Sequence, residues 1–179
     1  MPEFTNIGRG FRQRLLGLDG NFIYGRFSEL PETAGRGSQF FIPRRVLSVH
    51  PSSTIKSGSM VYDAEGNVML LGYNGADEFR GVYARTFKCF DLDRQLTWAR
   101  NTTAIDFVTK MPTTTSVQQL GPIWCAQEMM GEVSDMLKET KSRYRLLTSA
   151  ALQLEDVIGG TMIVRRVEYT LGITFAEIM

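Results

Sequence analysis

The residue types that most often catalyse reactions or bind metals are scarce in this sequence. It contains one histidine, His50, which precedes a proline in the segment SVHPSST. A metal site would need further ligands at a spacing such as HxxxH or CxxC, and the sequence offers neither. A Ser–His or Cys–His pair is conceivable, because catalytic residues need not be adjacent in sequence, but no pattern indicates one. We therefore expect His50 to make an ordinary hydrogen bond at a strand end, and we predict a protein that is not an enzyme and needs no cofactor or metal.

Two other groups of reactive residue types also favour structural roles. Cys89 and Cys125 lie in apolar, β-like runs and have neither CxxC spacing nor a basic cluster beside them. This pattern predicts two buried thiols rather than a disulfide or a nucleophile. Asp63 and Glu65 resemble the start of a calcium loop, but the remaining ligand positions and the closing glutamate are missing. The segment DAEGN is therefore predicted to be a polar turn, with Gly66 in its left-handed position.

The basic residues gather near the N-terminus. The formal net charge is only +1, but the first 45 residues hold seven arginines against four acidic residues. The segments GRGF (8–11) and GRGS (35–38) resemble phosphate cradles, yet they match neither a P-loop nor a GxGxxG fingerprint. Arginine pairs with phosphates and also with carboxylates in protein interfaces, and the near-zero net charge favours the interface.

An alternative use of this basic end is single-stranded nucleic-acid binding. Phe40 and Phe41 precede Arg44, as in a surface on which bases stack, although such a run more often begins a buried strand. The candidate interface residues are Arg9, Arg12, Arg26, Arg36, Phe40, Phe41, Arg44 and Arg45.

The length of the chain and its apolar runs define the expected fold. A chain of 179 residues fits one domain with a real core. No apolar stretch approaches the ~18 residues of a membrane span, and the N-terminus lacks the regions of a secretory signal, so we expect a cytoplasmic origin and no membrane partner. Strands are predicted by runs of β-forming residues, at about 12–18, 21–27, 40–49, 59–62, 68–73, 82–90, 96–100, 104–109, 122–127, 146–158 and 161–170.

Several local patterns refine this expectation. Asp19-Gly20 predicts a tight hairpin turn, and residues 68–71 are apolar on both strand faces, which favours a closed and covered barrel. The Gly/Pro-rich residues 28–39 predict a long exposed loop. In residues 128–144 the period changes, and apolar positions spaced by four predict a helix.

The predicted fold is therefore mainly β. It is a single domain over residues 1–179, a small β-barrel (about 12–127 and 146–171) with a long exposed loop and one helical insertion. No internal repeat is apparent.

Three segments carry a resemblance to a known family. The hairpin IKSGSMVYDAEGNVMLLGY (55–73) resembles the small β-barrel of head-completion proteins of tailed bacteriophages, the stopper or head-closure type. The similarity extends to FKCFDLDRQLTWAR (87–100) and to LEDVIGGTMIVRRVEYTLGI (154–173). It covers about half of the chain.

The resemblance implies a virion structural protein, assembled in the host cytoplasm, that forms a ring in the neck and joins the head to the tail. Its implied partners are copies of itself, the portal or adaptor, and tail proteins, and contact with packaged DNA is an open alternative. Three other functions are weighed beside it: a tail or baseplate structural protein, a single-stranded nucleic-acid-binding barrel and, least favoured, an enzyme with a dispersed site.

Overall fold

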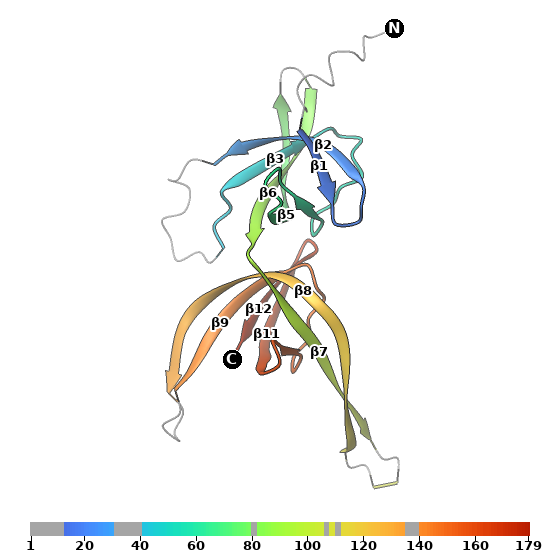
Figure 1. Cartoon of the computed structure of the whole chain (residues 1–179), viewed down its shortest axis with the longest axis vertical. Coiled ribbons are helices and arrows are strands. Elements are labelled where there is room, and N and C mark those ends of the chain that lie inside the picture. The colour runs from blue at the N-terminus through green and yellow to red at the C-terminus, as the bar shows by residue number, and fades with distance from the viewer. Residues whose placement is uncertain (1–12, 31–40, 80–81, 106–107, 110–111, 135–139) are drawn as a thin grey trace. The chain divides into compact units, whose positions relative to one another are not determined.

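The structure is a computed structural model that describes residues 13–30, 41–79, 82–105, 108–109, 112–134 and 140–179. In these residues all the regular elements are β-strands, which confirms the predicted mainly β fold. The chain divides into two compact units, Met1–Asp93 with Leu171–Ile173, and Arg94–Thr170 with Thr174–Met179. Each unit contains a closed barrel, where the sequence predicted a single domain with one barrel (Figure 1).

Barrel 1 is an antiparallel barrel in the first unit. It closes because the first and fourth strands pair at Leu16 with Tyr62 and at Gly17 with Val61, which leaves the sheet without an open edge at this point. Later strands must then pair elsewhere, and this is the physical reason for a second barrel. The closed order is β1-β2-β3-β6-β5-β4, from β1 (Gln13–Gly17), β2 (Phe22–Glu29), β3 (Arg45–Val49), β4 (Met60–Tyr62), β5 (Val68–Phe79) and β6 (Val82–Leu92).

The predicted turns and the predicted buried strand of barrel 1 are confirmed. Gly20 and Gly66 both have positive φ, at 81° and 87°, in the turns that join β1 to β2 and β4 to β5. All four residues from Val68 to Leu71 are buried, so both faces of β5 are covered at its start. The core of barrel 1 is formed by apolar side chains that point inward from every strand, among them Leu15, Leu47, Val61, Met69, Leu71 and Phe87.

Barrel 2 lies in the second unit and follows the same path. Its closed order is β10-β11-β12-β9-β8-β7, and its core includes Ile123, Cys125, Leu146, Leu152, Ile158 and Val164. Its strands are β7 (Arg94–Ile105), β8 (Pro112–Ser134), β9 (Thr140–Thr148), β10 (Val157–Ile158), β11 (Met162–Thr170) and β12 (Ile173–Ile178). In each barrel the first three strands are neighbours and the sixth, fifth and fourth complete the circle.

The predicted helical insertion over residues 128–144 is wrong. β8 continues to Ser134 and β9 begins at Thr140. A spacing of four residues is shared by one face of a helix and one face of a strand, so Met129 and Val133 fit both patterns. A β-bulge between Met129 and Gly131, with Gly131 at φ 140°, further disturbs the alternation by which a strand is recognised.

The predicted long loop over residues 28–39 is not supported where the structure describes these residues. Ser28 and Glu29 belong to β2 and pair with β3, and the Leu30 N–H donates to the Arg44 carbonyl. The remainder, residues 31–39, lies outside the described residues. The strand predicted at 40–49 begins only at Arg45.

In each barrel, the loop before the fourth strand places an apolar side chain in the core. In barrel 1 this loop carries Ile55, and in barrel 2 it carries Leu152. Both side chains are buried within the core of their own barrel. We call these two residues the plug residues. Because each one fills the inside of a barrel, its loop is part of the core rather than a surface connection.

Candidate functional site

His50, Cys89 and Cys125, the residues with catalytic potential, lie in surroundings that are typical of structural residues. His50 directly follows β3, and its Nδ1 accepts the Ser52 N–H and lies 2.6 Å from Ser52 Oγ, which confirms the predicted strand-end hydrogen bond. Cys89 and Cys125 are buried and form no disulfide, as predicted. Burial raises the pKa of the Cys89 thiol to about 12, so this thiol stays protonated at neutral pH. Among the described residues, no group of three His, Cys, Asp or Glu side chains could hold a metal ion.

The predicted interface residues that the structure describes have different surroundings. Arg26 is exposed on β2, and Arg44 is exposed just before β3. Phe41 is only 6% exposed, so its ring packs inside the unit. Arg9, Arg12, Arg36 and Phe40 lie outside the described residues.

Arg45, another predicted interface residue, holds a turn of barrel 1. Its guanidinium lies 3.3 Å from both Asp63 and Asp91. Burial opposes the ionisation of Asp63, but hydrogen bonds from Asn67 and from the backbone N–H of Glu65, with the charge of Arg45, outweigh it and lower its pKa. The segment DAEGN is therefore a hydrogen-bonded polar turn, as predicted.

An exposed strip on the outer face of barrel 1 was not predicted from the sequence. Arg14 and Leu16 of β1 lie opposite Tyr24 and Phe22 of β2, and Arg26 follows two residues later on the same face. The rings of Phe22 and Tyr24 are 54% and 60% exposed. The Arg14 guanidinium lies over the Phe22 ring, 3.4 Å from its centroid. We call these five residues the aromatic strip.

The signal for the aromatic strip was present but ambiguous. In β2 the outward residues Phe22 and Tyr24 alternate with Ile23 and Phe27, which pack against the core. Both alternating sets contain large apolar residues, so the hydrophobic pattern does not say which set faces inward.

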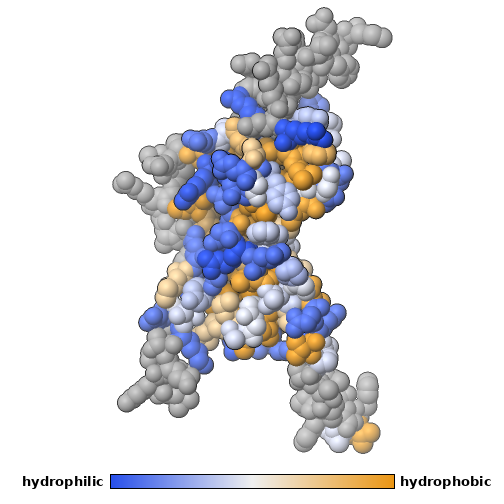
Figure 2. Space-filling model, in the orientation of Figure 1, coloured by the Kyte–Doolittle hydropathy of each residue, from blue (hydrophilic) through white to orange (hydrophobic). Residues whose placement is uncertain are grey.

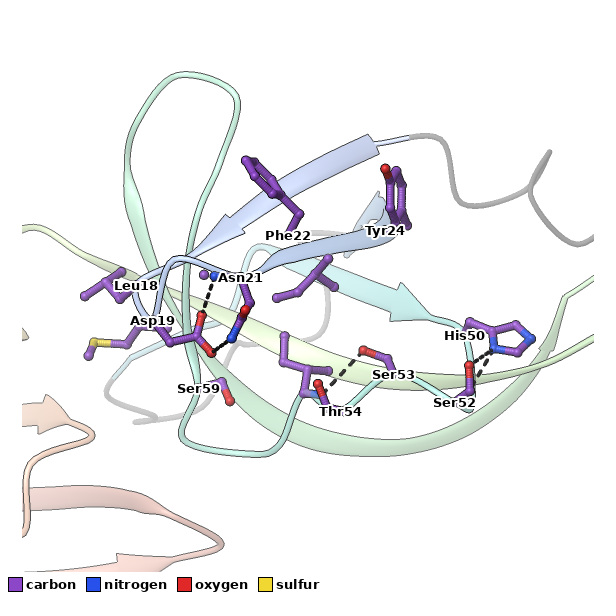
Figure 3. A pocket seen from close by; sticks show the side chains of 14 residues that line it. Leu18, Asp19, Asn21, Phe22, Tyr24, His50, Ser52, Ser53, Thr54 and Ser59 are labelled. Carbon is purple, nitrogen blue, oxygen red and sulfur yellow. Dashed lines mark hydrogen bonds between the residues drawn. The ribbon is translucent and has the colours of Figure 1, made fainter.

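A depression of about 530 Å³ lies beside the aromatic strip, between the β1–β2 turn, β2 and the segment after β3 (Figure 3). At one end, Asn21 donates its backbone N–H and its side-chain amide to the two carboxylate oxygens of Asp19. These hydrogen bonds, the side-chain one first, lower the pKa of Asp19. Most of the other polar groups that line the depression are neutral hydroxyls, those of Ser52, Ser53, Thr54 and Ser59.

A second exposed feature belongs to barrel 2. β7 and β8 pair beyond the barrel as far as Ile105 with Pro112 (Figure 1). Past Ala99, β7 has no strand neighbour but β8 among the described residues, and β8 pairs with β9 only from Cys125 onward. A β-bulge at Trp98/Ala99 marks the place where the hairpin leaves the barrel. We call residues 101–105 and 112–118 the ribbon.

Both outer edges of the ribbon lack a partner strand within the described residues, and the sequences of its two strands, NTTAI and PTTTSVQ, hold no charged residue. Val117 on the ribbon is 57% exposed. Proteins usually protect an open strand edge with charges, especially lysine, or with a covering element.

Figure 2 shows hydrophobic and hydrophilic residues interspersed on the visible face of each unit, so neither unit presents one continuous apolar surface in this view.

No helix in the described part of the chain is long and apolar enough to cross a membrane. Comparison with known proteins gives no further assignment: no family model, no curated protein and no solved structure matches the chain.

Proposed function

We propose that this protein is a non-enzymatic structural protein of a bacteriophage virion, and that copies of it form a ring in the neck between the head and the tail. The observation that carries the proposal is the ribbon of barrel 2. An isolated two-stranded ribbon is marginally stable in water, and an uncharged strand edge readily pairs with another chain. A ribbon of this kind suits a protein that works by assembly.

Two further features support an assembly role. The hairpin over residues 55–73, which carries the resemblance to head-closure proteins, forms β4, a tight turn and β5, and belongs to the wall of a closed barrel. The ribbon extends from another closed barrel, so each unit offers a rigid body on which contacts with neighbours can be built. The proposed partners are other copies of the chain, a portal or adaptor protein, and a tail protein. A place in the tail or baseplate is the alternative within the same class.

The direct test is a phage that lacks this chain, complemented with wild-type or altered protein. We expect DNA-filled heads and free tails to accumulate without it, and the wild-type chain to restore joined particles that contain it. Joined, infectious particles formed in its absence would refute the neck role. Complete tails that fail only at adsorption would place the protein in the baseplate instead.

The contribution of the ribbon is tested by Val117→Lys, because a lysine beside an open edge opposes strand pairing. Sedimentation of the purified chain should show fewer oligomers for this variant. Thr170→Lys is the matched control, since it places the same charge at an exposed strand end in the same unit. An equal effect of both substitutions would assign the loss to net charge rather than to the ribbon.

A further inference from the structure

We infer that the aromatic strip of barrel 1, with the depression beside it, binds a single strand of nucleic acid by base stacking. This site lies in a different unit from the ribbon and goes beyond the proposed assembly role. Three observations carry it: the spacing and exposure of the rings, the charge of the strip, and the chemistry of the depression.

The rings form a stacking platform. Phe22 and Tyr24 are two residues apart on one strand, about 6.6–6.8 Å along its axis, and both are more than half exposed. Every base has a planar face that can stack on an aromatic ring, so such a platform accepts many sequences. The Arg14 guanidinium already lies 3.4 Å from the Phe22 centroid, which shows that a planar group fits against this ring. A guanidinium plane can itself stack on a base.

The charge of the strip suits a polyanion. Arg14 and Arg26 bring two positive charges to the strip, which holds no carboxylate. The acidic groups nearest in sequence are Asp19, in the hairpin turn, where Asn21 donates to both of its oxygens, and Glu29, at the end of β2. Two cations would neutralise about two phosphates, and release of the counterions from a single strand gives a slope of about −1.4 in log K against log salt concentration.

The depression supplies hydrogen-bonding groups next to the platform. Hydroxyls donate and accept, so they can meet base edges and sugar hydroxyls of different kinds. Figure 3 shows Ser52, Ser53 and Thr54 on the segment across the depression from β2, with the Phe22 and Tyr24 rings pointing away from that segment, so the hydroxyls lie beside the platform and not over it. Its volume of about 530 Å³ is in the range of small-molecule sites.

A nucleic-acid strand fits these features better than a protein does. A stable protein interface buries about 800 Å² on each partner around a well-packed apolar core. The aromatic strip offers two rings and the partly exposed Leu16, bordered by guanidinium groups and by a polar depression. The strip is therefore narrow and bordered by polar groups, which suits a single strand.

The test measures binding of the purified full chain to fluorescently labelled oligo(dT) by anisotropy, at several salt concentrations and with duplex DNA as a competitor. We expect Tyr24→Ala to weaken binding by about ten- to a hundredfold, since one base–aromatic stack is lost. Tyr24→Phe should retain binding because it keeps the ring. Arg14→Gln should reduce the salt slope by about 0.7.

Tyr83→Ala is the matched control, because Tyr83 is a 69% exposed ring on β6 of the same unit. Lack of oligonucleotide binding by the wild-type chain, or equal losses in Tyr24→Ala and Tyr83→Ala, would overturn the inference. Self-association that Tyr24→Ala abolishes, without any oligonucleotide binding, would reassign the strip to a protein partner. None of these outcomes depends on particle assembly, so the proposed neck role is tested separately.

Discussion

The two barrels follow the same chain path but stabilise it with different side chains. In barrel 1 the Gly58 N–H donates to the Leu71 carbonyl, and the Leu71 N–H donates to the Ser59 carbonyl. Barrel 2 repeats this pair of bonds: Glu155 donates to Val164, and Val164 donates to Asp156. The residues at the start of each pair, Gly58 and Glu155, both have positive φ, at 85° and 67°. The two plug loops therefore have the same pattern of backbone hydrogen bonds and a left-handed residue at the same position.

The groups that hold the plug loops differ. In barrel 1, Arg85 donates to the carbonyls of Ser53 and Ile55, at 2.9 and 3.0 Å. In barrel 2, the equivalent carbonyls accept from neutral hydroxyls, with Thr174 donating to Ala150 at 2.6 Å and Tyr169 donating to Leu152. A buried carbonyl needs a donor, but the donor can be a guanidinium, a threonine or a tyrosine.

The next difference is a buried charge. Ser59 Oγ accepts the Lys56 N–H in barrel 1, and Asp156 accepts the equivalent Gln153 N–H in barrel 2. Asp156 is 1% exposed and also accepts from Trp98 and from Arg100, the latter at 2.8 and 2.9 Å. This fold is therefore specified by the positions at which backbone groups need hydrogen-bond partners, and not by the residue types that supply them. Because the partners vary, the repeat is not visible in the sequence.

The largest expected effect is at Asp156, the buried charge beside the plug loop of barrel 2. Asp156→Ala should lower the free energy of unfolding of barrel 2 by about 3–5 kcal/mol, because it leaves Arg100, Trp98 and the Gln153 N–H without their acceptor. Both tryptophans, Trp98 and Trp124, are in this unit, so urea unfolding followed by their fluorescence reports on barrel 2.

The matched change in barrel 1 is Ser59→Ala. It removes one neutral acceptor and should cost only about 1 kcal/mol, measured by urea unfolding followed by circular dichroism. Equal losses from the two substitutions would mean that the buried charge contributes nothing special to barrel 2.

The plug residues should behave alike. Leu152→Ala and Ile55→Ala should each destabilise their own barrel by about 2–5 kcal/mol, because each removes a buried side chain and leaves a cavity. Chemical denaturation with both optical probes separates the two barrels. A large loss in one barrel alone would break the proposed equivalence of the two loops.

The response to acid should be shared by both barrels. Asp63 and Asp156 have pKa values below the ordinary 3.8, since hydrogen bonds and arginine outweigh burial. A carboxylate whose pKa is lowered by folding stabilises the fold above its unfolded pKa, and this contribution is lost as the pH falls through the folded pKa. Both barrels should therefore lose stability below about pH 4.

Asp156→Asn separates the two responses. It removes the titrating group from barrel 2 and should flatten the acid limb of the tryptophan signal, while the circular dichroism change from barrel 1 remains. An unaltered acid limb in this variant would assign the effect to other carboxylates.

The smallest expected effect concerns the left-handed residue of the plug loop. Glu155 has a φ of 67° and stands at the position in barrel 2 that corresponds to Gly58 in barrel 1. Glu155→Gly should therefore be more stable than Glu155→Ala by about 1 kcal/mol, since only glycine adopts this conformation without steric cost. Both variants lose the exposed ion pair with Arg165, so their difference isolates the backbone. If Glu155→Ala were instead the more stable variant, the positive φ at this position would not determine which residue is preferred there.

Local features of the fold could be predicted from the sequence. The Asp19-Gly20 and Asp63–Asn67 turns, the doubly buried start of β5 and the buried cysteines each depend on a few neighbouring residues whose chemistry allows one arrangement. The two closures could not be predicted, because they depend on short pairings between distant segments, β1 with β4 and β7 with β10.

The exposed features were hidden for a different reason. The ribbon is made of ordinary strand-forming residues, and a sequence does not say whether such residues pair inside a barrel or beyond it. The aromatic strip was hidden because both faces of β2 carry large apolar residues. Six of the predicted interface residues are arginines chosen for their charge, and Arg45 shows that an arginine in a basic segment can pair with carboxylates of its own unit.

The position of β12 also sets the order in which the protein matures on the ribosome. All strand pairs of barrel 1 lie within residues 13–92, whereas β9 in barrel 2 needs β12, whose residues 174–178 pair with 144–148. Translation at about 5–20 residues per second separates the end of β6 from the end of β12 by roughly four to seventeen seconds. During that interval every strand pair of barrel 1 can form, although Leu171–Ile173 of the same unit are not yet made, while the buried Leu146 and Leu147 of β9 have no partner strand on the β12 side. We therefore expect the nascent chain to expose most apolar strand surface late in synthesis, after β9 and before β12 is made.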